Sequence, residues 1–423
     1  MTRMLSLASL KALLYFLASS TAFITLHATA DEDHYNNILI GDRPAGMGGA
    51  YTAIADDASG LFYNPAGIVH ASGSGISGSM NAYHITKTTY KNALGGQTDW
   101  TRKSSNFLPN YFGLFQNLGK SKIGFSYAIL DSIRENQDQR FFNLTETPNA
   151  IDEYVINFNN QEDVYNLGLS FATEFTSNFS WGITLYAHSR TKERILHQYI
   201  DFNDSSGGDY EQSTNYFSVD EQGVRPVLGL MWSPWNKISL GLNINKTFLT
   251  SYEETTQKTE KKQADSVVTR EEITSNEKSD LPLNLRGGIA YFPDEKLLIS
   301  TDLSYHEAYG FRNSVLNFAV GTEYYLNSSW AVRGGFYSNY ANTPELVNQG
   351  LQPEAKQLEH VDMYGLSFSF SRFSSNSSLS FGVNYSAGSG TAQLFPADNN
   401  GNALLQDTEM SSFTLFISAT SSY

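Results

Sequence analysis

The sequence predicts an all-β protein: a 14-stranded antiparallel transmembrane β-barrel plugged by an N-terminal hatch with short helices. Three observations predict this fold. A secretory leader opens the chain, strands with period-two alternation fill the region from about residue 73 onward, and short turns alternate with long polar loops between those strands. We therefore expect a signal peptide at residues 1–30, a hatch at 31–72 and a transmembrane barrel at 73–423.

The leader has the three parts of a cleavable signal peptide. Arg3 and Lys11 supply positive charge, residues 12–18 are apolar, and residues 28–30 read Ala-Thr-Ala, a small-x-small cleavage site. After it, no apolar run approaches the ~20 residues that a transmembrane helix needs. A membrane location of the mature chain therefore requires a barrel, and we expect the bacterial outer membrane with its lipids as surroundings.

The strands show two different faces, because apolar residues alternate with small or polar ones. In residues 123–129 four apolar side chains alternate with Gly, Ser and Ala, and residues 238–245 follow the same pattern. Residues 364–370 and 379–386 repeat it. A soluble β-sandwich would show the same alternation, so the connections must decide between the two.

The connections come in two kinds. Tight turns are expected at 117–120, 176–178, 233–236, 293–296, 327–329 and 373–377. Mostly long polar loops lie between them, at 91–106, 134–160, 193–220, 253–279, 340–360 and 389–409, with a shorter one at 310–314. Short periplasmic turns and long extracellular loops are typical of outer-membrane barrels, and these breaks define roughly fourteen strands.

Aromatic residues gather beside the short turns, where an interfacial girdle would lie. They are Phe179, Trp181, Trp232, Trp235, Tyr291, Phe292, Tyr324, Tyr325 and Trp330. The chain ends on Tyr423, in phase with Phe413, Leu415 and Ile417. A terminal strand that ends on an aromatic residue resembles the signal read by the outer-membrane assembly machinery, which we expect as a partner.

Composition excludes several other functions. The chain has 28 Lys+Arg against 43 Asp+Glu, a net charge of −15, which argues against nucleic acid as a partner. It has no cysteine, hence no disulfide, thiolate nucleophile or cysteine metal site. No catalytic motif occurs, and we expect no enzyme activity, cofactor or metal; His188 and His306 are interpreted as structural. The charged segment 253–280 is interpreted as a solvated extracellular loop.

The hatch segment does not alternate. Its glycines permit close packing and unusual dihedrals, a short helix is expected over Ala50–Ala55, and Asn64 before Pro65 is expected outside the helical region. The residues singled out as the hatch motif are Gly48, Gly49, Asp56, Asp57, Asn64, Pro65, Ala66 and Gly67.

The run Gly46–Gly67 resembles the hatch of the FadL/TodX (OMPP1) outer-membrane transporter family, most clearly in Asn64-Pro65-Ala66. The resemblance implies a plugged 14-stranded barrel and passive uptake of hydrophobic or amphipathic molecules such as long-chain fatty acids or hydrocarbons. The same segment is similar to a PorV-like branch of these proteins. That resemblance implies an accessory of protein secretion, which binds exported protein domains as its secreted partner.

Two pairs of ionisable residues fall in the lumenal phase of the strands. Arg286 and Asp302 flank one short turn at nearly equal distances, and Glu323 and Arg333 flank the next. Antiparallel pairing would set each pair face to face, so we expect lumenal ion pairs that bind hatch and barrel together. The alternative is that Arg286 or Arg333 binds the carboxylate head group of a substrate.

The first strand is rich in glycine. Gly73, Gly75 and Gly78 lie close together at its start. Because glycine weakens strand pairing, we expect a bent or poorly paired gate there.

Overall fold

A computed structural model describes residues 33–93, 98–144, 151–203, 209–262, 267–278, 281–352, 355–394, 397 and 400–423. The expected signal peptide, residues 1–30, lies outside the described residues. Within them, no helix is long and apolar enough to cross a membrane.

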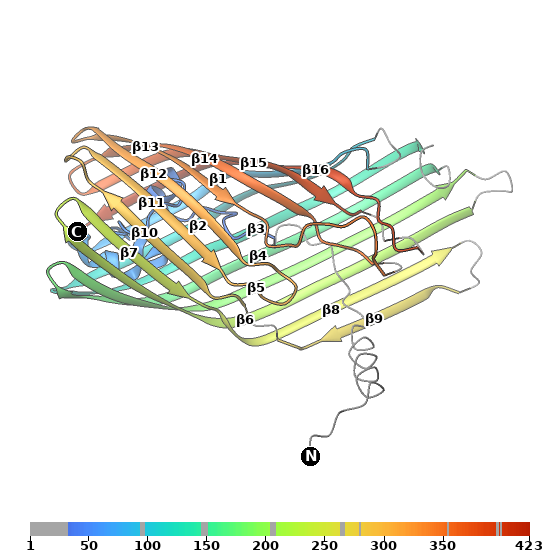
Figure 1. Ribbon diagram of the computed structural model, residues 1–423, viewed down its shortest axis with the longest axis horizontal. Helices are drawn as coiled ribbons and strands as arrows, with labels where there is room; N and C mark the ends of the chain where they lie inside the picture. Colours follow the sequence, from blue (N-terminus) through green and yellow to red (C-terminus); the bar gives the residue numbers. More distant parts are fainter. Residues whose placement is uncertain are drawn as a thin grey trace, which may run out of the picture.

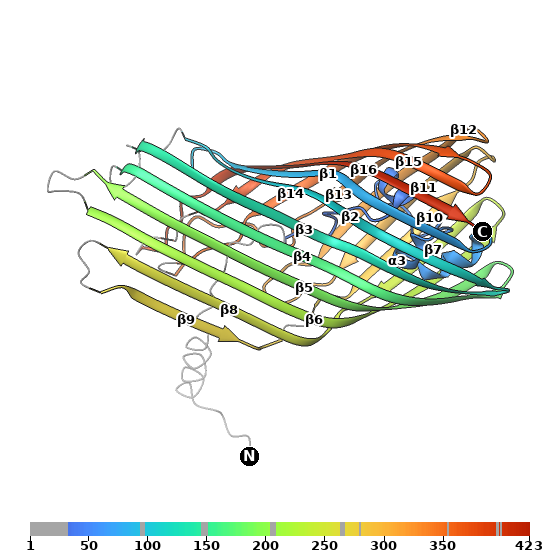
Figure 2. The same cartoon turned by 180° about the vertical axis from the view of Figure 1, so that it is seen from behind.

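Strands form the wall and short helices lie inside it (Figures 1 and 2). The helices are α2 (Asp42–Gly46), α3 (Gly60–Tyr63) and the 3-10 helix η1 (Pro65–His70). The strands are β1 (Gly75–Tyr90), β2 (Trp100–Leu118), β3 (Ser121–Leu144), β4 (Ile151–Thr176), β5 (Phe179–Phe202), β6 (Asp209–Trp235), β7 (Ile238–Asn245), β8 (Phe248–Lys262), β9 (Thr269–Ser275), β10 (Asn284–Tyr291), β11 (Leu297–His306), β12 (Val315–Asn327), β13 (Trp330–Asn339), β14 (His360–Phe373), β15 (Ser377–Ala392) and β16 (Gln406–Ser422).

The sixteen strand segments make a closed antiparallel wall of fourteen strands, as predicted. β6 pairs with both β7 and β8, which follow each other along one wall strand. β10 pairs with β7 and β9 pairs with β8, so β9 and β10 form the next one. The first and last strands close the ring, because β1 pairs with β16 from Gly75–Ser422 to Tyr90–Thr408.

The two faces of the wall differ as the alternation predicted. On β14, Leu366 and Phe368 point outward and are 62% and 55% exposed, whereas Ser367 and Ser369 point inward and are buried. An apolar outer face around a polar interior is the architecture of an outer-membrane barrel.

Several expected loops are strands instead. β3 runs to Leu144 and β4 begins at Ile151, so the expected loop at 134–160 is mostly a paired hairpin. Residues 100–106 of the expected loop at 91–106, and most of the expected loop at 193–220, are likewise strand. The segment 253–279 contains the β8–β9 hairpin, paired from Glu254–Ser275 to Glu260–Thr269. These extensions have a mainly polar outer face, whereas Tyr154, Ile156 and Phe158 of β4 are buried on the inner face, so their pattern is the reverse of that of a strand in the membrane.

The hatch lies inside the half of the barrel that carries the short turns, next to the C-terminus (Figure 1). It contains short helices, but the expected helix over Ala50–Ala55 is wrong, because that segment forms turns. Gly48, Gly49 and Ala55 have positive φ angles of 65°, 87° and 44°. The wall also binds two backbone N–H groups of the segment, those of Tyr51 and Thr52, which fixes these residues against Asp302.

Candidate functional site

A buried ionic cluster joins the first helix of the hatch to two adjacent strands. Arg43, from α2, donates to both carboxylate oxygens of Glu323 on β12, at 3.2 and 2.6 Å. Arg333 on β13 donates from Nε to Glu323 Oε1 at 2.7 Å and lies 3.5 Å from Asp42. Asp56 completes the cluster by accepting from Arg43. The structure thus brings the predicted Glu323–Arg333 pair together and adds hatch residues to it.

The second predicted pair does not form as expected. Asp302 lies opposite Gly288 rather than Arg286, which lies opposite Ser304 and donates to its hydroxyl at 2.8 Å. The prediction assumed that residues at equal distances from the turn face each other. The ladder is not symmetric about the turn, because its first pair is Tyr291 with Ile299, and the predicted partner of Arg286 is therefore wrong by two residues. Asp302 instead binds the hatch: its Oδ2 accepts from Tyr51 N, Thr52 N and Thr52 Oγ1 at 3.0, 2.9 and 2.6 Å.

The Asn-Pro-Ala-Gly segment fixes the second half of the hatch. Asn64 is extended, with φ −162° and ψ 98°, and its Oδ1 caps η1 by accepting from Ala66 N. Its Nδ2 donates to Thr52 O and to Leu230 O on β6, at 2.8 and 3.0 Å. Gly67 N donates to Asn64 O at 3.0 Å, which closes the turn. One buried amide therefore joins two parts of the hatch to the wall.

Replacement of Asn64 by Ala is expected to destabilise the plugged barrel by about 1–3 kcal/mol, because two buried carbonyl groups lose their donor. The check is the urea concentration at which the purified protein unfolds. Asn376→Ala, in an exposed turn, is the matched control and should unfold as the parent does. Equal midpoints for both variants would contradict the role assigned to Asn64.

The remaining motif residues shape the hatch. Burial raises the pKa of the Asp57 carboxyl, whose Oδ1 accepts from Ser59 N at 2.8 Å. A Cβ on Gly48 would lie 3.2–3.3 Å from backbone atoms of Gly335 and Phe336, so this glycine lets hatch and wall approach.

Glycines on the lumenal face of the wall make room for the hatch backbone. A Cβ added at any of them would come within 3.0 Å of a hatch atom, most often in the backbone. They are Gly182, Gly229, Gly241, Gly288, Gly321 and Gly335. The tightest backbone approach in this set is at Gly241, where the added Cβ would lie 2.1 Å from Thr52 O. The hatch therefore packs directly on the wall, backbone to backbone.

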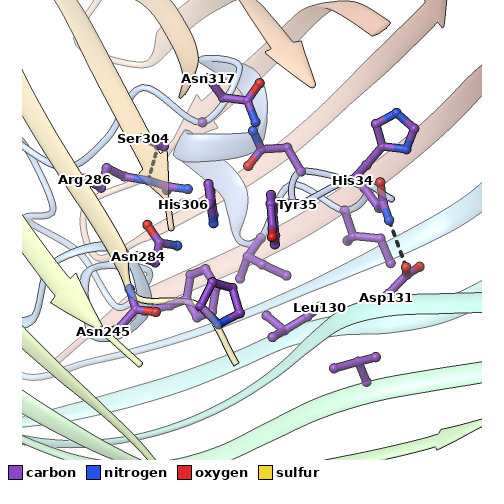
Figure 3. A pocket seen from close by; sticks show the side chains of 18 of the residues that line it. His34, Tyr35, Leu130, Asp131, Asn245, Asn284, Arg286, Ser304, His306 and Asn317 are labelled. Carbon is purple, nitrogen blue, oxygen red and sulfur yellow. Dashed lines mark hydrogen bonds between the residues drawn. The ribbon is translucent and has the colours of Figure 1, made fainter. Parts of the chain in front are cut away.

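A cavity of about 270 Å³ lies between the hatch and the wall (Figure 3). One side consists of polar side chains from β6 to β12, among them Arg225, Arg286 and His306. The other side carries apolar residues of the hatch and Leu130 of β3. Asn37 of the hatch donates to Asp131 Oδ2 at 2.8 Å at the edge of this cavity.

The expected gate at the start of the first strand is wrong. Gly75 pairs with Ser422 on one side and Phe115 on the other, and Gly78 pairs with Ala419 and Phe112. Gly73, which precedes the strand, has a positive φ of 62°. At these glycines β1 pairs with both β16 and β2, so the glycines do not interrupt the wall.

The hydrogen-bond ladder of the wall is interrupted instead between β2 and β3, and we call this unpaired stretch the wall opening. These strands pair up to Tyr111–Ala128 and again at Ser104–Glu135, in the same register on both sides, and are unpaired in between. Pro109, which has no N–H to donate, lies in the unpaired part of β2. The ladder is therefore interrupted locally, and the pairing register of the two strands does not change across the interruption.

Side-chain hydrogen bonds connect β2 and β3 across this opening, and a bulge lies beside it on β3. Asn106 Nδ2 donates to Ser132 O at 2.6 Å, and Arg134 N donates to Ser104 Oγ at 2.9 Å. On the other edge of β3 the register with β4 shifts at Leu130, between Ile129 and Asp131. A cavity of about 330 Å³ lies here, lined by Asn106, Phe107, Leu108, Tyr127, Ile129, Ser132, Arg134, Asp163 and Tyr165.

Several residues of the site were not singled out from the sequence. Arg43 and Arg225 carry no motif, and their roles depend on contacts more than 150 residues away in the chain. The wall glycines share the lumenal phase of their strands, and this common phase was a usable signal. Pro109 inside a strand and the adjacent apolar pair Ile129-Leu130 were the local signs of the opening.

A closed wall of fourteen strands, plugged by an N-terminal hatch, defines a plugged outer-membrane β-barrel. This is the fold of the FadL/TodX channels. No protein-family profile matches the sequence, and no curated protein matches it either.

The solved structures that resemble the chain include a Pseudomonas aeruginosa FadL homologue, with a TM-score of 0.64 and 13% identity over 90% of this chain and 99% of that one. The Pseudomonas putida toluene transporter TodX has a TM-score of 0.62 and 14% identity, over 91% of this chain and 98% of that one. The Ralstonia pickettii toluene transporter TbuX gives 0.59 and 15%, over 92% and 100%. At these identities the likeness is one of fold.

Proposed function

We infer that the chain is a passive outer-membrane channel for hydrophobic or amphipathic small molecules, such as hydrocarbons or long-chain fatty acids. The substrate enters from outside, binds above the hatch and leaves sideways through the opening between β2 and β3. Proteins of the same fold include toluene transporters, which supports a small hydrophobic substrate. Lateral exit suits such a substrate, because it avoids a fully aqueous passage.

The observation that carries this proposal is the position of the bulged segment of β3. Leu130 and Asp131 line the cavity above the hatch, whereas their neighbours Ile129 and Ser132 line the cavity in the wall. The same short segment therefore borders both spaces, at the place where the ladder with β2 is interrupted.

An entry chamber fits the outer end of this route. A cavity of about 480 Å³ lies between the extended strands, with Trp100, Tyr154 and Phe158 among its lining residues. Aromatic rings offer apolar contact area and tolerate many apolar ligands. A hydrophobic molecule thus meets an aromatic surface before it reaches the hatch.

Closing the wall opening is expected to stop transport. The chain has no cysteine, so Asn106→Cys with Ser132→Cys introduces the only thiols, and a short bis-methanethiosulfonate joins them across the opening through two disulfide bonds. In proteoliposomes, uptake of a hydrophobic probe should fall to the level of vesicles without protein, because the exit is tied shut. Reduction of the cross-link should restore uptake.

The matched control is the pair Ser378→Cys and Thr420→Cys, which face each other in the intact β15–β16 ladder. Cross-linking there should leave uptake unchanged. Undiminished uptake through the cross-linked Asn106–Ser132 variant would rule out exit between β2 and β3.

The extracellular end favours a second candidate, a PorV-like accessory of protein secretion. β9 pairs with β8, and in the described part of the chain its other edge has no strand partner. An open strand edge can bind an extended segment of another protein. A stable complex with a secreted protein, together with no uptake of hydrophobic probes, would favour this candidate over the channel.

A further inference from the structure

The outer face of the wall carries a groove at the seam where the first and last strands meet. Its volume is about 700 Å³, within the ~300–1,000 Å³ that is usual for small-molecule sites. Its lining residues come from β1, β2, β14, β15 and β16 and from the short turn after β14. Figure 2 shows β1, β16 and β15 side by side next to the C-terminus.

Small residues form the floor of this groove. Gly78 of β1 pairs directly with Ala419 of β16, and both face outward, because the neighbouring Ser77 and Ser418 are buried on the lumenal face. A Cβ added to Gly78 would meet no atom within 4 Å beyond its chain neighbours, so the space above this glycine is open. A glycine inside a strand often marks a site where a ligand approaches closely.

Larger apolar side chains flank the floor on both sides. Phe112 of β2 pairs with Gly78, and Leu379 of β15 pairs with Ala419, so the four residues form one row across the seam. Ile76 lies on the same outer face, two residues closer to the short turns. The outer face of a membrane barrel contacts acyl chains, so the groove opens toward lipid.

A cation extends this row. Arg372 of β14 pairs with Leu379, close to the short turn that joins β14 to β15. It is exposed, and its guanidinium carbon lies 5.4 Å from the ring centroid of Trp330. No carboxylate of the described chain lies within 4 Å of this guanidinium. Because short turns face the periplasm, its charge is available to an anion at the periplasmic boundary of the membrane.

Hydroxyl groups lie at the same end of the groove. Ser374 and Ser377, in and beside the turn after β14, and Ser421 of β16 are exposed and line it. A guanidinium can bind phosphate oxygens bidentately, and hydroxyls can donate to them as well. The groove thus joins a polar end, at the membrane boundary, to an apolar floor. A phospholipid has the same two parts.

We propose that this groove binds one phospholipid of the periplasmic leaflet, with its phosphate on Arg372 and an acyl chain over Gly78 and Ala419. The groove faces the membrane, and its cation has no contacting acid, so a lipid with an anionic head group fits both features. The bound lipid fills the hollow over the pair that closes the ring. This site is on the outer surface and is independent of what passes through the lumen.

The test of the polar end measures lipid binding by native mass spectrometry on the purified, lipid-depleted full-length protein in detergent. Dioleoyl phosphatidylglycerol is expected to bind at least about ten-fold more tightly than dioleoylglycerol, which has the same acyl chains but no phosphate. Arg372→Gln should abolish the difference, and Arg372→Lys should retain part of it. Lys296→Gln, which removes a positive charge from another exposed short turn, should retain all of it.

The test of the apolar floor fills it with a side chain. Gly78→Leu and Ala419→Leu should each weaken binding of phosphatidylglycerol about ten-fold or more, because the acyl chain loses its apolar contacts. The matched control is Gly287→Leu. Gly287 is an outward glycine of β10 with similarly open space at its Cβ position, and its replacement should leave lipid binding unchanged.

Equal binding of the two lipids by the parent protein, or unchanged binding of phosphatidylglycerol in both leucine variants, would overturn the proposal. Inorganic phosphate that competes as strongly as phosphatidylglycerol would also overturn it, because the site would then bind a bare anion. A dimer without bound lipid, lost in Gly78→Leu, would show instead that a second copy of this chain occupies the groove.

Discussion

Replacement of Gly335 by Ala is expected to displace the hatch from a barrel that otherwise stays closed. The added Cβ would lie 2.2 Å from Met47 C and 2.3 Å from Gly48 N, and both are backbone atoms that no rotamer change can move. Overpacking of this kind costs about 1–3 kcal/mol or more. Few hydrogen bonds join the hatch to the wall, whereas the wall strands are joined by backbone ladders. The hatch should therefore be displaced before the strands separate.

The measurements are conductance in planar bilayers and protease access to the hatch, both of which should rise in Gly335→Ala. The neighbouring Gly334 provides the control. An added Cβ there points outward, and the nearest atom is Ser367 O at 3.9 Å. Gly334→Ala should behave as the parent does. If the two variants were indistinguishable, the hatch would not rest on the lumenal glycines.

The wall could be predicted from the sequence because the alternation within each strand distinguishes its lipid-facing side from its lumenal side. Apolar residues at alternate positions, as in residues 364–370, define the outer face without knowledge of any neighbour. The tight turns then indicate which strands are neighbours, and an even number of antiparallel strands can close into a barrel. Beyond the membrane the pattern reverses. The outer part of the β3–β4 hairpin has a mainly polar outer face and buries Tyr154, Ile156 and Phe158 inside, so it lacks the apolar outer face that marks the membrane strands.

Contacts across the lumen could be predicted only in part. Glu323 and Arg333 face each other because the turn between them is tight, and counting along the chain finds the register. The turn after Tyr291 is longer, and the same counting misplaces Arg286 by two residues. An error of two keeps the side chain on the lumenal face but changes its partner. The sequence therefore predicted the face correctly and the contact wrongly.

The opening in the wall was hidden for a related reason. β2 and β3 keep the same register on both sides of it, because each strand changes face once within it: Asn110 and Tyr111 are both buried on β2, and Ser132 and Ile133 are both buried on β3. The glycines of β1 gave a stronger local signal, yet both neighbours of that strand pair with it. Glycine permits a break in a ladder, but the unpaired stretch here depends on Pro109 and on the bulge at Leu130.

Replacement of Glu323 by Gln is expected to have the largest effect on stability. Glu323 is fully buried, and its carboxylate binds Arg43 of the hatch and Arg333 of the wall. Gln keeps the shape but removes the charge that both guanidiniums face. Removing one partner of a buried ion pair costs about 3–5 kcal/mol. Urea unfolding should occur at lower concentration, and the hatch should become accessible to protease.

The matched control is Glu295→Gln, which removes the same charge from an exposed turn and should leave unfolding unchanged. Arg333→Ala separates the two roles that the sequence allowed for this arginine. Arg333 is 2% exposed, and its bonds go to Glu323, Asp42 and Ser371, so we expect it to act by holding the hatch. Its loss should therefore lower stability. If Arg333→Ala unfolded like the parent but no longer bound a fatty acid, Arg333 would be a substrate contact instead, because a structural ion pair cannot be removed from this cluster without cost.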